Sequence, residues 1–176
     1  MHAAKRKGRL TLTVEPGERR LFRRVLEAII RNYKTPPEAL PAPVTRVWYS
    51  TAGCQSARMS AEQSREWMDQ LRAMRNSRLR LLQRFLEGLQ SAGKGSSELR
   101  MSTDQAGDFM MSLNDHRLFL AAQHEIGEAE MDRPFFASAA SLTPARRKAL
   151  FEISALALVI EILLGVIDPE AVSWLE

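Results

Sequence analysis

The sequence is nearly free of cysteine, with Cys54 as the single one among 176 residues. One cysteine cannot close a disulfide within the chain, and a chain without disulfides suits the reducing cytoplasm. We therefore expect a cytoplasmic protein. A reactive thiol needs a nearby base and a positive environment, and no histidine lies near Cys54 in the sequence, so we interpret it as an incidental cysteine.

The sequence also lacks an apolar run long enough to cross a membrane. Residues 150–167 are almost wholly apolar, but Glu152 and Glu161 interrupt them and leave only eight uncharged residues in between. A transmembrane helix needs about 20 consecutive apolar residues. No apolar stretch follows the basic residues 1–7, so they do not read as a signal peptide. We expect a soluble protein with no membrane partner.

Recognisable catalytic and cofactor motifs are missing as well. Residues 88–95 read Gly-x-x-x-x-Gly-Lys-Gly, but Gly95 stands where a phosphate-binding loop needs Ser or Thr. His116 and His124 lie about 80° apart on a helical wheel, whereas metalloprotease helices place two histidines four residues apart. We therefore expect no enzyme activity, no catalytic residues, no cofactor and no metal.

What is present is an ordinary globular composition, with 45% hydrophobic and 26% charged residues. The length allows one domain with a real core and hardly two. We expect a basic, flexible N-terminus over residues 1–8 and a single helical domain over residues 9–176.

The net charge of +4 is unevenly distributed along the chain. Residues 1–34 hold ten Lys and Arg against three Asp and Glu, whereas residues 101–176 hold five against twelve. The basic half is suited to phosphates or acidic proteins. Alternatively the two halves neutralise each other within one fold, and we favour this reading because parts of one small domain lie close together.

Hydrophobic periodicity predicts the elements. Leu10, Leu12 and Val14 alternate with polar residues, which predicts a strand over 9–14, and residues 44–49 read as a second strand. Helical spacing and capping signals predict helices over 16–33, 60–90, 103–127 and 144–167, followed by a short helix ending in Trp174. The predicted fold is mainly α: a helical bundle around an apolar C-terminal helix, with a small two-stranded β ribbon near the N-terminus.

The last helix carries charge that has to be accommodated. Glu152 and Glu161 lie about 180° apart on the helical wheel, so they cannot share one solvent-facing strip. We expect Glu152 to pair with Lys148, one turn earlier. Glu161 lies deep in the apolar run, where an unpaired carboxylate is costly. We expect an arginine, with Arg117 as the candidate, to pair with Glu161 in the core or at a subunit interface.

Arginines form rows on the two long predicted helices of the N-terminal half. Such rows are suited to a nucleic-acid backbone. Acidic residues are interleaved with them, so pairs within a helix are also available, and no DNA-binding motif is recognisable. The basic surface candidates are Arg20, Arg24, Arg31, Arg65 and Arg72.

One stretch resembles a known family. Residues 112–120 read Ser-Leu-Asn-Asp-His-Arg-Leu-Phe-Leu, which is similar to the Leu-Asn-Asp-Leu-Arg-Leu-x-Leu signature of the uncharacterised bacterial DUF2017 family. The short first strand leading into Pro16-Gly17-Glu18, and the order of polar, signature and apolar helices, also resemble that family. His116 stands where the family usually has leucine, and Ala121, Gln123 and Glu125 replace its usual Gly, Arg and Gly, as in a divergent member.

The resemblance implies the order of the elements and no assigned activity. Asn114, Asp115 and Arg117 match the signature by position, and we interpret their role as structural. The candidates for a structural polar core are Asn114, Asp115, Arg117 and Glu161.

The absence of catalytic constellations and the segregated charge favour one function. We expect a non-enzymatic, cytoplasmic regulatory or adaptor protein that binds an as yet unknown protein partner, with a homodimer as one form of that binding. The alternative is a nucleic-acid-binding regulator that uses the Arg-rich N-terminal half. Steep loss of affinity for random duplex DNA with salt would distinguish the alternative.

Overall fold

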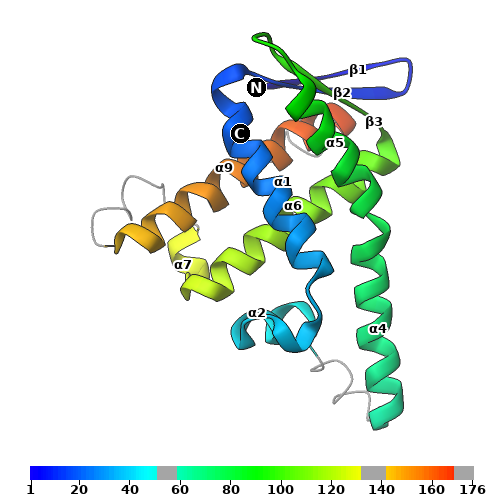
Figure 1. Ribbon diagram of the computed structural model, residues 1–176, viewed down its shortest axis with the longest axis vertical. Coiled ribbons are helices and arrows are strands. Elements are labelled where there is room, and N and C mark those ends of the chain that lie inside the picture. Colours follow the sequence, from blue (N-terminus) through cyan, green and yellow to red (C-terminus); the bar gives the residue numbers. More distant parts are fainter. Residues whose placement is uncertain (51–58, 132–141, 169–176) are drawn as a thin grey trace.

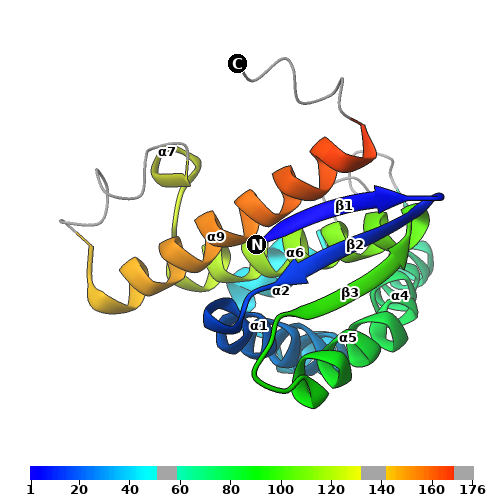
Figure 2. The same ribbon diagram turned by 90° about the horizontal axis from the view of Figure 1, so that it is seen from above.

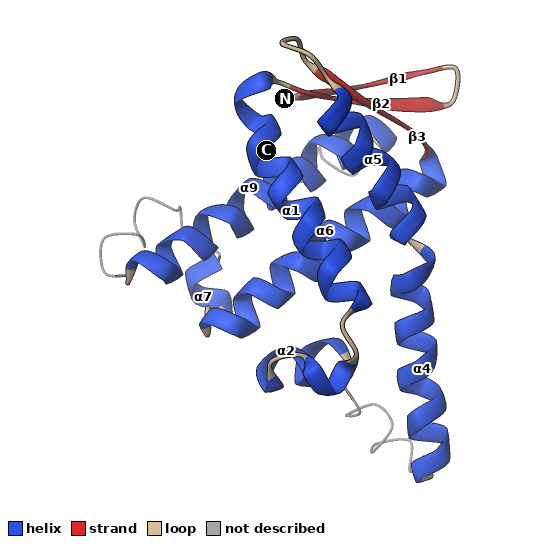
Figure 3. Cartoon of the chain, in the orientation of Figure 1, coloured by secondary structure: helices blue, strands red, loops and turns tan. Residues whose placement is uncertain are grey.

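The computed structural model describes residues 1–50, 59–131 and 142–168. The protein is a mainly helical bundle with a small antiparallel sheet at one end, which confirms the predicted fold class (Figures 1 and 3). The sheet has the strand order β1-β2-β3. Its strands are β1 (His2–Arg6), β2 (Arg9–Val14) and β3 (Ser97–Ser102).

The first two strands form a tight hairpin. Lys7 and Gly8 connect them with φ angles of 49° and 75°, and two residues with positive φ are typical of the type I′ turn that suits the right-handed twist of paired strands. Residues 1–8 were expected to be a flexible extension, but β1 pairs along the whole of its length with β2. The predicted strand over 9–14 is confirmed.

The second predicted strand, over residues 44–49, is wrong. This segment forms helix α2 (Ala42–Trp48), which begins at a proline pair suited to a first turn. Val44 and Trp48, four residues apart, both turn to the core. The sheet is completed instead by β3, in which Leu99 and Met101 are buried and alternate with exposed residues.

The helices largely follow the predicted order. The helix expected over 60–90 is two helices, because it breaks at Arg78. Cys54 and Trp174 lie outside the described residues. The helical elements besides α2 are α1 (Pro16–Lys34), the 3-10 turn η1 (Pro37–Ala39), α4 (Ala61–Ser77), α5 (Leu79–Ser91), α6 (Thr103–His124), α7 (Glu128–Met131) and α9 (Pro144–Ile167).

Helix α6 occupies the middle of the bundle. It packs along α9 and also contacts α1, α2, α5 and the sheet (Figures 1 and 2). Phe109 and Leu113 of α6 are completely buried, and they join the core formed by the inner face of the sheet and by α1 and α5.

The apolar C-terminal helix is therefore not the buried centre that the sequence suggested. One face of α9 packs on α6, but Phe151 and Leu158 on its other face are 51% and 56% exposed. Among the described residues, α9 alone has the length and composition to cross a membrane, and 33% of its most apolar window is buried. One helix of this kind is weak evidence of a membrane span, because core helices of soluble proteins meet the same criterion.

Candidate functional site

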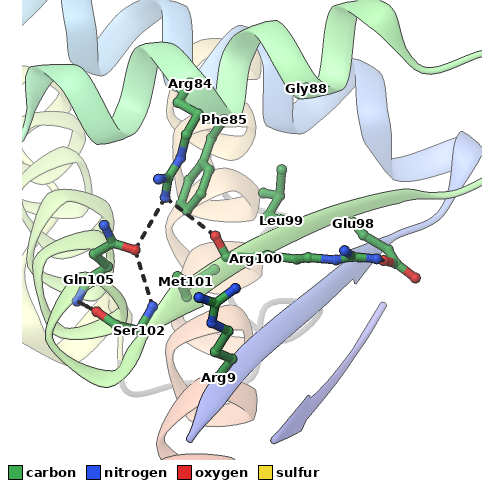
Figure 4. Close-up of a pocket in the computed structure, with 10 residues that line it drawn as sticks. All are labelled: Arg9, Arg84, Phe85, Gly88, Glu98, Leu99, Arg100, Met101, Ser102 and Gln105. Atoms are coloured by element: carbon green, nitrogen blue, oxygen red, sulfur yellow. Dashed lines mark hydrogen bonds and ion pairs between the residues drawn. The ribbon is translucent and has the colours of Figure 1, made fainter. Parts of the chain in front are cut away.

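A groove lies between α5 and the outer edge of β3 (Figure 4). Its volume is about 800 Å³. Arg84, Phe85 and Gly88 of α5 form one wall, and residues 98–102 of β3 form the other, with Arg9 of β2 at the side. The groove thus follows a strand that has a sheet neighbour on one side only.

The hydrogen bonds at this edge show which backbone groups of β3 point into the groove. Arg84 Nη2 donates to the carbonyl of Arg100 at 3.3 Å, and the amide of Ser102 donates to Gln105 Oε1 at 3.1 Å. The N–H and C=O of one residue in an antiparallel strand point to the same side, and alternate residues point to opposite sides. Arg100, Ser102 and hence Glu98 direct their backbone groups away from β2.

The geometry of the β1–β2 hairpin independently indicates the same direction for the backbone groups of β3. In a two-residue hairpin the flanking residues, Arg6 and Arg9, exchange hydrogen bonds with each other. Arg9 therefore points its backbone groups to β1, so its pair with Ser102 on β3 is a non-hydrogen-bonded one. The amide of Arg100 and both backbone groups of Glu98 consequently open onto the groove.

The groove is basic at its rim and apolar at its floor. The Arg9 side chain makes no hydrogen bond or ion pair within the described part of the chain, whereas the Arg100 side chain pairs with Glu98 at 2.7 Å. Both partners of that pair are solvent-exposed, and such pairs contribute only about 0–1 kcal/mol. A Cβ added to Gly88 would lie 4.0 Å from Leu99 Cδ2, so this glycine keeps one wall free of a side chain.

A second polar cluster gathers around Asp115. Its Oδ2 accepts a hydrogen bond from the Tyr33 hydroxyl at 2.7 Å and lies 3.4 Å from both Arg75 Nε and Arg78 Nη1. Its backbone carbonyl accepts from Trp48 Nε1 at 3.0 Å. Asp115 therefore ties α6 to α1, to α2 and to the junction of α4 and α5.

The two arginines of this cluster are buried, with 9% and 6% of Arg75 and Arg78 exposed. The guanidinium of Arg75 lies over the rings of Trp48 and Tyr49 at 4.9 and 5.1 Å. Burial raises the pKa of Tyr33, and the negative charge of Asp115 raises it further. The cluster is enclosed, as in a structural clamp, and the Nε atoms of Arg75 and Arg78 form ion pairs but no hydrogen bond within the described residues.

Sequence reasoning identified Asp115 but missed Arg75 and Arg78. A signal was available, because these arginines fall at helical spacing between Leu71 and Leu82, on the stripe that faces the core. A charged residue on an apolar stripe needs a buried partner of opposite charge.

A third cluster joins α1, α6 and α9. His116 Nε2 lies 2.9 Å from Glu152 Oε1, and Arg24 Nη2 donates to Glu152 Oε2 at 2.8 Å. The expected pairing of Glu152 with Lys148 is therefore wrong. Burial alone would raise the pKa of Glu152, but the hydrogen bonds from His116 and Arg24 hold that pKa below its ordinary value.

The remaining core candidates lie near the surface. Asn114 is exposed and accepts from Arg117 Nη1 at 3.3 Å. Glu161 is exposed, so the carboxylate expected inside the core lies at the surface instead. Burial lowers the pKa of the half-buried Arg117, and the charge of Glu161 opposes this shift.

The basic surface candidates do not form one continuous row. Arg24 and Arg31 line the same pocket, while Arg20 lines a separate hollow beside the end of α5. Arg65 is exposed on α4, and Arg72 is half-buried near Tyr49, where its charge opposes the rise in the tyrosine pKa that burial causes.

The Gly-Lys-Gly segment is not arranged as a phosphate cradle. Arg19 donates to the carbonyls of Ala92, Gly93 and Gly95, so this turn presents oxygens to a cation rather than amides to an anion. In the described ranges no three His, Cys, Asp or Glu side chains are grouped as metal ligands.

Comparison with known proteins gives one match. A family model described as "Domain of unknown function (DUF2017)" matches residues 1–167. No curated protein and no solved structure matches the chain.

Proposed function

Because the chain belongs to the DUF2017 family, a domain of unknown function, we propose its function from its own surface. The protein is a non-enzymatic cytoplasmic regulatory or adaptor protein that binds an extended, acidic segment of a partner protein along β3. The observation that carries this proposal is the open edge of β3 beside the wall formed by α5.

The backbone of the groove is suited to strand addition. The amide of Arg100 and the backbone groups of Glu98 can form hydrogen bonds with a polypeptide laid alongside β3. Peptide-binding domains commonly use this mode, in which main-chain hydrogen bonds supply affinity and pockets for alternate side chains supply specificity. Phe85 and Leu99 offer the apolar floor that such alternate side chains need.

The charge of the groove selects the chemistry of the partner. Arg9, Arg84 and Arg100 bring three positive charges to a groove that has one carboxylate, Glu98. Charge complementarity steers association and disfavours partners of like charge. A segment carrying Asp or Glu beside apolar residues therefore fits best.

The alternative, a nucleic-acid-binding regulator, has one specific observation in its favour. Arg6 and Arg9 are cross-strand neighbours, and Arg100 lies on the strand that flanks them, so the outer face of the sheet is basic. Open backbone groups at a strand edge suit a polypeptide better than a phosphate backbone, because they offer donors and acceptors alternately. For this reason we favour the peptide.

The experiment selects peptides from a random 12-residue display library on the full chain and measures their affinities by fluorescence anisotropy. Gly88→Gln fills the groove wall and should weaken the selected peptides at least about tenfold, which corresponds to about 1.4 kcal/mol. Gly107→Gln is the matched control, since it also changes a helical glycine and a Cβ added there meets nothing within 4 Å. Arg9→Glu should weaken acidic peptides, whereas Arg65→Glu on the distant α4 should not.

Hydrogen exchange gives a second readout at single residues. Peptide binding should slow exchange of the Glu98 and Arg100 amides, which face the groove, and leave that of Leu99, which faces β2, unchanged. No enriched peptide, or equal binding by wild type and Gly88→Gln, would contradict the proposal. Binding of random duplex DNA that falls steeply with salt and is lost in Arg9→Glu would favour the alternative.

A further inference from the structure

A pocket of about 410 Å³ lies between α1, α6 and α9, apart from the groove at β3. Five basic or titratable side chains line it together with the Glu152 carboxylate: Arg24, Arg31, His116, His124 and Lys148. None of the elements of the peptide groove except α6 contributes to it. It is therefore a second candidate site with its own chemistry.

Two cations of this pocket remain available to a ligand. Arg24 is engaged by Glu152 at 2.8 Å, so these two charges offset each other. Arg31 and Lys148 are exposed at the pocket, and within the described residues the side chain of neither makes a hydrogen bond or an ion pair. Arg31 and Lys148 therefore bring two uncompensated positive charges to the lining.

The buried end of the pocket has an incomplete hydrogen-bond network. His116 is 3% exposed, and its Nε2 faces the Glu152 carboxylate at 2.9 Å. Nε2 is the ring nitrogen that pairs with Glu152, so Nδ1 is the nitrogen left to contact another group. Nδ1 is buried and has no partner among the described residues. Buried polar atoms normally have partners, so an orphaned one beside a pocket points to a ligand.

We propose that this pocket binds a small phosphate monoester that carries a hydroxyl group. The doubly charged phosphate lies between Arg31 and Lys148, and the hydroxyl is directed to His116. A phosphate monoester matches the two free cations in charge, and arginine is well suited to phosphate recognition. This site goes beyond the peptide groove and does not depend on it.

The three histidines of the chain make the site observable. The experiment records long-range proton–nitrogen NMR spectra of the imidazoles while glycerol 3-phosphate is added to the full protein. His116 and His124 line the pocket, whereas His2 lies on β1 and serves as an internal control. Signals of the first two should shift with a saturable dependence, and that of His2 should stay in place.

Matched probes separate the parts of the ligand. Inorganic phosphate, which lacks the carbon-bound hydroxyls, should bind more weakly, and glycerol should not shift the signals. Glycerate, which carries a single carboxylate charge, should also bind more weakly. Equal affinity for glycerate and glycerol 3-phosphate would overturn the assignment of a phosphate.

Surface variants test the cations without threatening the fold. Arg31→Gln and Lys148→Gln should each weaken glycerol 3-phosphate about tenfold, as expected from the loss of one charge-assisted hydrogen bond. Lys34→Gln, one turn from Arg31 on α1, should bind like wild type. Unchanged affinity in both pocket variants, equal weakening by the control, or a shift of His2 alongside the others would overturn the proposal.

Discussion

Replacement of Asp115 by asparagine tests whether the cluster around it holds the bundle together. The change removes a negative charge while keeping the shape of the side chain and an acceptor for the Tyr33 hydroxyl. Arg75 and Arg78 then lose the carboxylate that lies 3.4 Å from each of them. Since both guanidinium groups are buried, water cannot readily replace it.

The expected loss in the free energy of unfolding follows from the contacts that Arg75 and Arg78 retain in Asp115→Asn. Removing one partner of a buried ion pair costs about 3–5 kcal/mol. Arg78 keeps Asp108 at 3.4 Å, and Arg75 keeps its aromatic contacts with Trp48 and Tyr49. We therefore expect Asp115→Asn to lower the free energy of unfolding by about 2–3 kcal/mol, below the full cost of a broken buried pair.

Urea unfolding followed by circular dichroism measures this loss, and thermal unfolding checks it. In a chain of this size about 1 kcal/mol shifts Tm by about 2–4 °C, so Tm should fall by about 4–12 °C. Asn114→Ala is the matched control, because the Asn114 side chain is adjacent to Asp115 in the sequence but exposed. This substitution should change the free energy of unfolding by less than about 0.5 kcal/mol. If Asp115→Asn were as mild as its control, Asp115 would not be a structural clamp.

Three further predictions concern other parts of the bundle. Glu152→Gln should destabilise the protein by about 2 kcal/mol at neutral pH, through loss of hydrogen bonds to a charged group. Because the folded state lowers the pKa of Glu152 from 4.5, this contribution is present above that pH and is lost as the pH falls through the folded pKa, so urea titrations of both proteins should converge in acid. Gly88→Ala should raise the free energy of unfolding by about 0.5–1 kcal/mol, since alanine favours a helix and its Cβ meets Leu99 only at 4.0 Å; a lower Tm would contradict this. Trp48→Phe removes a donor to a carbonyl and weakens a cation–π contact, so it should cost about 1–2 kcal/mol, whereas Trp67→Phe at an exposed position should have little effect on chemical unfolding.

The sequence predicted helices well because most of them are marked at both ends and along their length. Pro16 begins α1, and Ser102 with Gln105 forms the capping box of α6. The strand predicted over residues 44–49 is wrong because the segment is too short for its pattern to be decisive. Its β-branched and aromatic residues favour a strand, but the four-residue spacing of Val44 and Trp48 is equally typical of a helix. Tertiary packing on α6 decides between the two.

The sheet was predicted less completely because β3 is defined by its pairing with a strand that is distant in the sequence. Strand β3 is six residues long and directly precedes the capping box of α6, and no strand is predicted there from the sequence. Its identity depends on pairing with β2, about 90 positions earlier, which periodicity within a window cannot reveal. The groove could not be predicted for the same reason, since it exists only once β3 lies beside α5.

The two glutamates of α9 show a related limit of prediction from sequence. The helical wheel correctly separated Glu152 from Glu161, but it could not say which of them faces the bundle. The apolar run suggested Glu161, and the structure buries Glu152 because His116 and Arg24 supply donors from two other helices. A buried carboxylate is thus placed by partners that are distant in sequence rather than by the hydropathy around it.

Helix α6 explains why neighbouring residues of one short stretch have unrelated surroundings. Consecutive residues of a helix are rotated by about 100°, so Asp115 faces Arg75, Arg78 and Trp48 while His116 faces Glu152. A peripheral helix would leave one of these directions to solvent, whereas a central helix has a partner in each. Adjacent polar residues are therefore compatible with a central helix when each has its own buried partner. Asp115 and His116 meet this condition, which explains how α6, rather than the more apolar α9, occupies the centre of the bundle.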